Sequence, residues 1–330
     1  MKHLLAVFLV LSNAPVSEPI WACPHVLESR QIAVREVVRG DESADDAFLS
    51  RPVALAFDES RLYVADAEAC AVKVFTREGC FAASYGRKGQ GPGEFSFPSG
   101  VSVRGGRIHV ADKFNFRIQV LDLEGNWLKG FRVPFAPDKV FALKDDLILV
   151  THNPLNRSGS EKMLHAFDGQ GRLLWEGFES RFSGDPVYDS FRNMIAVSPG
   201  PAGDFFLIFK CDGREIFHFD PAGRPIAEIP LDERYEDKPL SLPLKSGKRS
   251  IRGVGWSWAS SGGRFFLLAP AYTAGKDLGP GREVFRFDRT GRLDGMIRLP
   301  REMILIAVDG DMIFAVDLDR ELSILRMNER

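Results

Sequence analysis

Residues 118–125 read IQVLDLEG, in which apolar and polar residues alternate before a short turn that ends in glycine. Four other segments repeat this pattern, at residues 72–79 (VKVFTREG), 164–171 (LHAFDGQG), 216–223 (IFHFDPAG) and 284–291 (VFRFDRTG). A degenerate sixth copy, residues 322–329 (LSILRMNE), ends in glutamate, and the ends of successive copies are 38 to 68 residues apart. Repeats of about 40–50 residues with four short strands are typical of propeller blades. We therefore expect an all-β, six-bladed β-propeller with four antiparallel strands per blade.

Two more strands are expected before each copy, because residues there alternate with the period of a strand. They are residues 53–57 and 62–65, 100–103 and 108–111, 139–143 and 147–150, 194–197 and 205–209, 253–258 and 265–268, and 304–308 and 312–316. No segment shows a helical period. The sixth blade runs out of chain after three strands, and residues 31–39 (QIAVREVVR) belong to no other blade. We therefore expect this N-terminal strand to close the ring and residues 31–330 to form a single propeller domain.

Two residue types recur at fixed places in the copies. A tight turn needs one residue with positive φ, which glycine adopts at no steric cost. An aspartate three residues earlier can accept hydrogen bonds from the turn, which favours a structural role over a catalytic one. These aspartates are Asp122, Asp168, Asp220 and Asp288. The chain has 26 Phe, and several precede the turns, where their flat rings would pack blade against blade: Phe75, Phe167, Phe219 and Phe287.

Composition excludes several classes of protein. The 330 residues include 43 Lys+Arg and 45 Asp+Glu, a formal net charge of −2, with 45% hydrophobic and 27% charged residues. These values are ordinary for a globular protein and argue against wholesale disorder, a multispan membrane protein or a dedicated nucleic-acid binder. Four cysteines are too few for a disulfide scaffold. Cys70 and Cys80 are expected near opposite ends of a hairpin, too far apart for a disulfide.

The N-terminus has the features of an export signal. A basic start is followed by the apolar run 4–11 (LLAVFLVL) and by small residues. The run is far shorter than the ~20 residues that span a bilayer, and the alternative is a buried strand. We assign residues 1–22 to the signal, which predicts a secreted or periplasmic protein. Residues 20–23 (IWAC) partly resemble the lipobox of bacterial lipoproteins, so lipid anchoring through Cys23 is an alternative to release.

Residues 89–125 carry a more specific pattern. It comprises GQGPGEF, then Pro98-Ser99-Gly100-Val101, Val110-Ala111-Asp112 and Asn115-Phe116-Arg117-Ile118. This stretch resembles an NHL repeat, and the first blade repeats part of it with Pro52 and Val64-Ala65-Asp66. The strong match covers about a quarter of the chain. The resemblance implies a six-bladed propeller like those of exported bacterial proteins.

Long insertions are expected on one face of the ring. In a propeller, the loops between second and third strands and the links between blades share a face. Long loops on one face of a rigid scaffold commonly carry binding sites, the alternative being tolerated decoration. The insertions are residues 153–161, 179–191, 232–249 and 272–282.

Basic residues are expected around the channel mouth on this face, at or just before the innermost strands. They are Arg51, Lys139, Arg192, Arg252 and Arg301, with His152 and Asn153 on the same rim. Cations in a low-dielectric funnel favour an anionic ligand such as a carboxylate, phosphate or sugar acid. The alternative is that they are ordinary surface charges, neutralised by acids such as Asp138 and Glu302.

Three functions remain open. The leading hypothesis is a non-enzymatic binding or scaffold module for a protein partner or small anionic ligand, as a monomer and without metal or cofactor. The second is a propeller hydrolase or lyase of the lactonase type, since some six-bladed relatives are metal-dependent enzymes with a site at the channel. No HExxH, GxSxG or phosphate-binding glycine loop supports catalysis. The third, an RNA-binding propeller, conflicts with the export signal and the acidic balance, so no nucleic-acid partner is expected.

Overall fold

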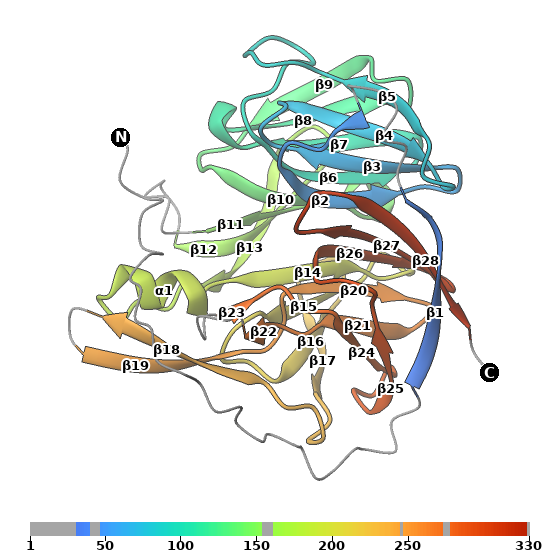
Figure 1. Ribbon diagram of the computed structural model, residues 1–330. Coiled ribbons are helices and arrows are strands. Elements are labelled where there is room, and N and C mark those ends of the chain that lie inside the picture. Colours follow the sequence, from blue (N-terminus) through green and yellow to red (C-terminus); the bar gives the residue numbers. More distant parts are fainter. Residues whose placement is uncertain (1–30, 40–46, 154–160, 245–246, 273–277, 329–330) are drawn as a thin grey trace.

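The segments with alternating apolar and polar residues form six antiparallel four-stranded sheets, which are arranged as the blades of a propeller (Figure 1). The structure is a computed structural model that describes residues 31–39, 47–153, 161–244, 247–272 and 278–328. The predicted export signal, residues 1–22, and Cys23 lie outside these residues, as do 154–160 and 273–277 of the insertions. Blades 1 to 5 run from the innermost to the outermost strand in chain order, whereas blade 6 takes its outermost strand from the N-terminal segment. The all-β, six-bladed prediction is thereby confirmed.

The first three blades follow the sequence prediction within two residues. Blade 1 is β2 (Pro52–Phe57), β3 (Arg61–Asp66), β4 (Ala71–Thr76) and β5 (Phe81–Tyr85). Blade 2 is β6 (Pro98–Arg104), β7 (Arg107–Asp112), β8 (Arg117–Asp122) and β9 (Trp127–Arg132). Blade 3 is β10 (Pro137–Ala142), β11 (Ile148–His152), β12 (Lys162–Phe167) and β13 (Leu173–Glu179).

The last three blades have the same order of strands. Blade 4 is β14 (Ile195–Pro199), β15 (Phe205–Phe209), β16 (Glu215–Phe219) and β17 (Pro225–Pro230). Blade 5 is β20 (Ser257–Ser261), β21 (Arg264–Leu268), β24 (Glu283–Phe287) and β25 (Leu293–Arg298). Blade 6 has β26 (Met303–Asp309), β27 (Met312–Asp317) and β28 (Leu322–Asn328), and its fourth strand is β1 (Gln31–Arg39).

The ring is closed by the N-terminal strand, as predicted. β1 pairs antiparallel with β28 from Ala33 opposite Asn328 to Arg39 opposite Ser323. Its first two residues, Gln31 and Ile32, also pair in parallel with β25 of blade 5. Figure 1 shows this strand in blue beside the red C-terminal strands. A strand from one end of the chain thus completes the blade made by the other end and covers the open edge of β28.

Each phenylalanine before a turn packs against the preceding blade. All four are buried: Phe75, Phe167, Phe219 and Phe287. Phe75 packs in a cluster with Phe314 of blade 6, and the Phe167 ring lies 5.4 Å from that of Phe131 in blade 2. The Phe219 and Phe287 rings likewise reach blades 3 and 4. Since a buried phenylalanine contributes about 1.5–3 kcal/mol, these rings hold successive blades together.

The turn aspartates have the predicted structural role. Asp122 Oδ1 accepts hydrogen bonds from the backbone N–H groups of Glu124 (3.0 Å) and Asn126 (2.8 Å). Asp220 Oδ1 does the same with Ala222 and Arg224, both at 2.9 Å. Asp168 and Asp288 bind their turns in the same way. The glycines that follow these four aspartates have φ between 76° and 87°.

The insertions contain structure that the sequence did not predict. Between blades 3 and 4 lies a helix, α1 (Pro186–Arg192), which Asp185 caps by accepting from Val187 and Tyr188. Between blades 4 and 5 lies a hairpin of β18 (Lys238–Leu244) and β19 (Gly247–Gly253), and blade 5 carries the short pair β22 (Ala271–Tyr272) and β23 (Leu278–Gly279). Figure 1 shows α1 beside the β18–β19 hairpin, and Tyr188 packs against Ile251 there. The strand expected at 253–258 is therefore wrong in its bounds, because Gly253 ends the hairpin and β20 begins at Ser257.

Candidate functional site

The central channel holds a cavity of about 440 Å³ on the face that carries the long insertions. All six innermost strands contribute to its wall, which is mostly apolar. The apolar lining includes Val53, Val101, Val140, Phe141, Met194, Ile195, Trp256, Trp258, Ile304 and Leu305. The polar lining is Asp138, Lys139, Thr151, His152, Asn153, Asn193, Lys210 and Ser257. The polar and charged groups come chiefly from blades 3 and 4, so the two sides of the channel differ in chemistry.

One position of the repeat explains this asymmetry: the residue at the end of each second strand. In blades 1, 2 and 6 it is an aspartate that is at most 2% exposed: Asp66, Asp112 and Asp317. In blades 3, 4 and 5 the residue paired at the same place is His152, Lys210 or Ala269. Blades 3 and 4 thus place an imidazole and an ammonium group where the other half of the ring keeps a carboxylate.

The three aspartates tie down the link that enters their blade. Asp66 accepts hydrogen bonds from the backbone N–H groups of Ser50 (2.6 Å) and Arg51 (2.8 Å). Asp112 accepts from the Ser96 N–H (2.7 Å) and from the Arg117 guanidinium (2.8 Å).

The Arg117 guanidinium also donates to the carbonyl groups of Gln90, Gly91 and Glu94. The segment that resembles an NHL repeat is therefore a clamp on the link between blades 1 and 2. Asp317 in blade 6 binds Arg301, at 3.0 Å.

Lys210 follows β15, and its side chain lines the cavity. Among the residues that the structure describes, none forms a hydrogen bond or ion pair with its ammonium group. Burial, with the nearby positive charge of Lys139, lowers the pKa of Lys210 to about 8. At pH 7 the group therefore remains mostly charged, although no described residue supplies it with a direct partner. An ammonium group in this state favours an anion in the cavity.

Lys139 differs from Lys210, because the protein already holds its ammonium group. Its Nζ donates to the carbonyl oxygens of Val53 (2.8 Å) and Ser99 (2.6 Å), which fixes it between blades 1 and 2. Burial and the charge of Lys113 lower its pKa, whereas neighbouring Asp138 raises it. Burial alone would raise the pKa of Asp138, but the charges of Lys139 and Lys113 outweigh burial, so the pKa is lowered. The Lys113 Nζ lies 3.1 Å from Asp138 Oδ1. The negative charge of Asp138 is thus neutralised by these two lysines.

His152 is buried in the wall at 2% exposure. Its Nδ1 donates to the carbonyl oxygen of Lys162 (3.3 Å), and its ring centroid lies 4.8 Å from that of Phe135. Burial lowers the pKa of His152, so the ring is neutral at pH 7. Trp258 in the same wall has a buried Nε1–H that finds no hydrogen-bond acceptor among the described residues. The cavity therefore offers donors more readily than acceptors.

Three of the seven residues predicted for the site line the cavity: Lys139, His152 and Asn153. The other four, Arg51, Arg192, Arg252 and Arg301, are not among its lining residues and contact other groups. The Arg51 guanidinium lies over the Phe97 ring (5.1 Å) and that of Arg192 over the Tyr188 ring (5.3 Å). Arg252 pairs with Asp237 at 3.3 Å, and Arg301 with Asp317 and Glu321. The structure does not gather these four arginines at the channel.

Lys210 is not among the residues predicted for the site from the sequence. Aligning the ends of the second strands would have revealed it, since VAD in blades 1 and 2 becomes VTH in blade 3 and IFK in blade 4. Within the part of the chain that the structure describes, no group of three His, Cys, Asp or Glu residues is placed to hold a metal ion. No helix among the same residues is long and apolar enough to cross a membrane.

Comparisons with known proteins agree with the fold. Residues 42–199 match a family model described as a 6-bladed beta-propeller. A solved structure described as an exported protein from Bacteroides fragilis is 14% identical, with a TM-score of 0.58 over 90% of this chain and 95% of that chain.

Two enzymes have a similar fold at equally low identity. Virginiamycin B lyase from Staphylococcus aureus is 10% identical, with a TM-score of 0.53 over 90% of this chain and 100% of that chain. Hydrazine synthase of Kuenenia stuttgartiensis is 13% identical, with a TM-score of 0.54 over 88% and 98%. A search of curated proteins gave no match. At these identities the likeness concerns the fold alone.

Proposed function

We propose that the protein is a non-enzymatic binding module that takes a small carboxylate with an apolar body into its channel. The observation that carries this proposal is the Lys210 ammonium group, which lines the cavity without a protein partner among the described residues. A carboxylate beside it would form a charge-assisted hydrogen bond, roughly twice as strong as a neutral one. The apolar wall would cover the rest of the ligand.

The charges around Lys210 support an anion rather than a cation. Lys139 contributes a second positive charge that is fixed by two carbonyl groups, and the one carboxylate in the lining, Asp138, is paired with Lys113. A cavity of about 440 Å³ is in the range that holds small molecules. Its low dielectric strengthens these interactions relative to those in water.

We further propose that the module works outside the cytoplasm as a monomer and belongs to the NHL-like propellers. The apolar run within residues 1–22 and the motif between Gly91 and Ile118 support this proposal. Similarity in fold to an exported bacterial protein is consistent with it.

A protein partner on the same face is a second candidate function. Large apolar side chains are exposed on the links and loops of this face: Phe48 (60%), Phe114 (59%), Phe182 (56%), Val187 (51%) and Leu318 (56%). Exposed apolar residues of this kind mark interaction surfaces when they are contiguous. Loss of partner binding in a Phe114→Ser, Phe182→Ser double variant, with channel binding retained, would separate this function from the first.

Calorimetric titration of the purified protein at pH 7 tests the channel proposal with four probes. Hexanoate and benzoate carry both a charge and an apolar body, hexanol lacks the charge, and acetate lacks the body. We expect one of the first two to bind more tightly than hexanol and acetate. Lys210→Met should weaken that binding about tenfold to a hundredfold, because this is the loss of affinity that corresponds to the free energy of one hydrogen bond to a charged group.

Lys88→Met is the matched control, because Lys88 is an exposed lysine outside the channel. It should bind like the unmodified protein. Equal affinity of Lys210→Met and Lys88→Met would contradict the proposal, as would preference for hexanol over hexanoate. Turnover of a lactone by the unmodified protein would instead support the hydrolase or lyase alternative.

A further inference from the structure

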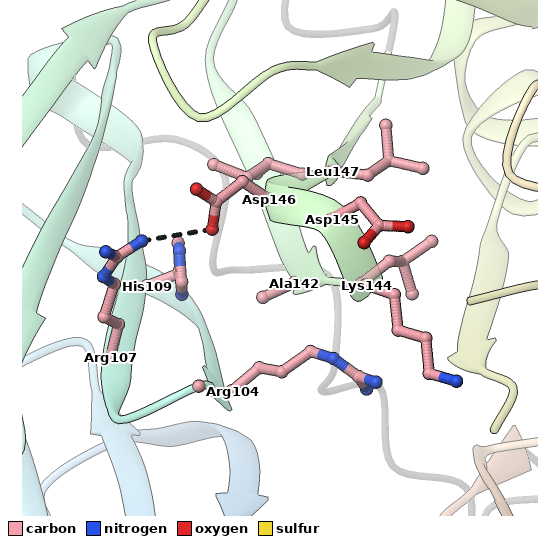
Figure 2. Close-up of a pocket in the computed structure, with 11 residues that line it drawn as sticks. Arg104, Arg107, His109, Ala142, Lys144, Asp145, Asp146 and Leu147 are labelled. Atoms are coloured by element: carbon pink, nitrogen blue, oxygen red, sulfur yellow. Dashed lines mark hydrogen bonds and ion pairs between the residues drawn. The ribbon is translucent and has the colours of Figure 1, made fainter. Parts of the chain in front are cut away.

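A second pocket lies on the opposite face, between blades 2 and 3 (Figure 2). Its volume is about 240 Å³, and its wall is formed by the turn between β6 and β7 and by the segment from β10 to β11. That segment includes a single 3-10 turn, η3 (Lys144–Asp146). First-to-second strand turns lie at the end of the blade away from the channel site. This pocket is therefore separate from the one that contains Lys210.

His109 of β7 lines this pocket and has an unsatisfied ring nitrogen. Its side chain is 6% exposed, and Nδ1 is buried without a hydrogen-bond partner among the described residues. Burial lowers the pKa of His109 to about 4, with Lys129 and Arg107 adding to the effect, so the ring is neutral at pH 7. A buried polar atom without a partner is costly, and such an atom in a pocket is a place for a ligand group.

The charged groups around His109 fall into two sets. Arg107 Nη1 pairs with Asp146 Oδ1 at 3.1 Å beside the imidazole, as the dashed line in Figure 2 marks. Arg104 and Lys144 also line the pocket, and within the described part of the chain neither side chain has a hydrogen-bond or ion-pair partner. Their side chains extend in the same direction in Figure 2. Asp145 also lines the pocket and contributes one carboxylate. Besides the Arg107–Asp146 pair, the pocket therefore has two cations and one anion, an excess of one positive charge, together with a neutral hydrogen-bonding atom at its wall.

The backbone of the pocket wall is strained at this place. Asp145 and Asp146 have φ of 58° and 56°, in the left-handed region that costs a residue other than glycine about 1–3 kcal/mol. The ion pair between Asp146 and Arg107 is one of the contacts that can offset this cost. The two consecutive αL residues lie directly beside Lys144, at the edge of the pocket.

We propose that this pocket binds a small hydroxylated anion, with its anionic group between Arg104 and Lys144 and a hydroxyl group on His109 Nδ1. The excess positive charge of the lining favours an anion, and the unsatisfied imidazole nitrogen favours a hydroxyl group, which can either donate or accept a hydrogen bond. One molecule that meets both needs is a sugar acid, whose carboxylate matches the planar fork of an arginine. A sugar phosphate shares this chemistry, and the test distinguishes the two.

Calorimetric titration at pH 7 uses glucuronate, glucose 6-phosphate, glucose and acetate as probes. Glucose lacks the anion and acetate lacks the additional hydroxyl groups, so both should bind at least tenfold more weakly than the better of the first two. Tighter binding of glucuronate identifies a carboxylate ligand, and tighter binding of glucose 6-phosphate identifies a phosphate ligand. Failure of both to bind would overturn the proposal.

Variants assign the binding to this pocket. Arg104→Met changes a half-buried side chain without an ion pair and should weaken binding at least fivefold with an unchanged melting temperature. His109→Phe should reduce the affinity for glucuronate to that for acetate, and its melting temperature shows whether it folds. Lys210→Met should bind the probe normally, since it alters only the channel. Loss of binding in Lys210→Met, or normal binding in Arg104→Met, would overturn the proposal for this pocket. Neither result would overturn the channel proposal, which the titrations with hexanoate and benzoate test separately.

Discussion

The half of the ring formed by blades 6, 1 and 2 differs from the half formed by blades 3, 4 and 5 at one position of the repeat. In the first half a buried aspartate ends the second strand and ties the entering link: Asp66, Asp112 and Asp317. In the second half that position carries His152, Lys210 or Ala269, and the insertions α1, β18–β19 and β22–β23 are all found there. In the first half, the residue at this position stabilises the fold by binding the entering link. The second half is free to present polar groups to the channel.

Deletion of residues 31–39 should reduce the stability of the protein most, because β1 completes blade 6 in the first half and closes the ring. We expect the free energy of unfolding to fall by about 5 kcal/mol, a large share of a domain's total stability. Replacing the β18–β19 hairpin of the second half with a short glycine–serine link should cost much less, since no blade depends on it for a strand. Urea unfolding of both deletion variants measures the difference. Equal losses would contradict the division of the ring.

Asp112→Ala should have the next largest effect. The carboxylate is fully buried and paired with Arg117, so its removal leaves a cation and the link between blades 1 and 2 without their acceptor. Breaking a buried pair in this way costs about 3–5 kcal/mol. Urea unfolding at pH 7 gives the value. A loss below 1 kcal/mol would show that the clamp does not hold the link.

Lys210→Met changes the corresponding position of blade 4 and should raise the stability of the protein, whereas Asp112→Ala lowers it. The folded-state pKa of Lys210, about 8, is below that of an unfolded lysine, so its charge opposes folding at pH 7. We expect the variant to be more stable by about 1 kcal/mol at pH 7, after allowance for solvent screening. This gain should shrink as pH rises from 8 to 10.5, because the lysine loses its charge in the folded state well before it does so in the unfolded state. Unfolding curves at pH 7 and 10.5 measure it, and a loss of stability at pH 7 would contradict the assignment.

Asp122→Ala and Asp220→Ala should have the smallest effects, and they should match. These partly exposed turn aspartates belong to different halves but accept equivalent backbone hydrogen bonds. Each substitution should cost about 1 kcal/mol, the net value of an ordinary hydrogen bond. Thermal unfolding of the pair measures both. A difference of several kcal/mol between them would mean that the halves also differ on the turn face.

The fold was predictable from the sequence because its determinants are local and repeated. Period-two alternation recurs in each blade, a turn glycine with positive φ in five blades and a turn aspartate in four, and one unassigned strand closes the ring. The helix α1 was not predictable in this way, since seven residues cover barely two turns and their position depends on packing against Ile251 of the hairpin.

The site was predicted only in part, because its residues come from different positions of the repeat. Lys139 pairs with Thr151 just after a register shift between Pro137 and Lys139, where β10 approaches β6 closely. A Cβ on Gly100 would lie only 2.9 Å from the Lys139 Cα, which is why this approach needs glycine. Arg51 and Arg301 lie before their strands, at the clamps, and are used there. Lys210 lies one residue beyond the strand expected at 205–209, at the position where blades 1, 2 and 6 carry an aspartate, so a prediction of single strands did not single it out.

The most direct test of the channel site is the pH dependence of carboxylate affinity, measured by calorimetry with the tighter of hexanoate and benzoate from pH 6.5 to 9.5. Because the charged form of Lys210 is needed, we expect the affinity to be nearly constant below pH 7.5 and to fall about tenfold per pH unit above pH 8. The dependence should be absent from Lys210→Met. An affinity that stays constant across this range in the unmodified protein would contradict the role of Lys210.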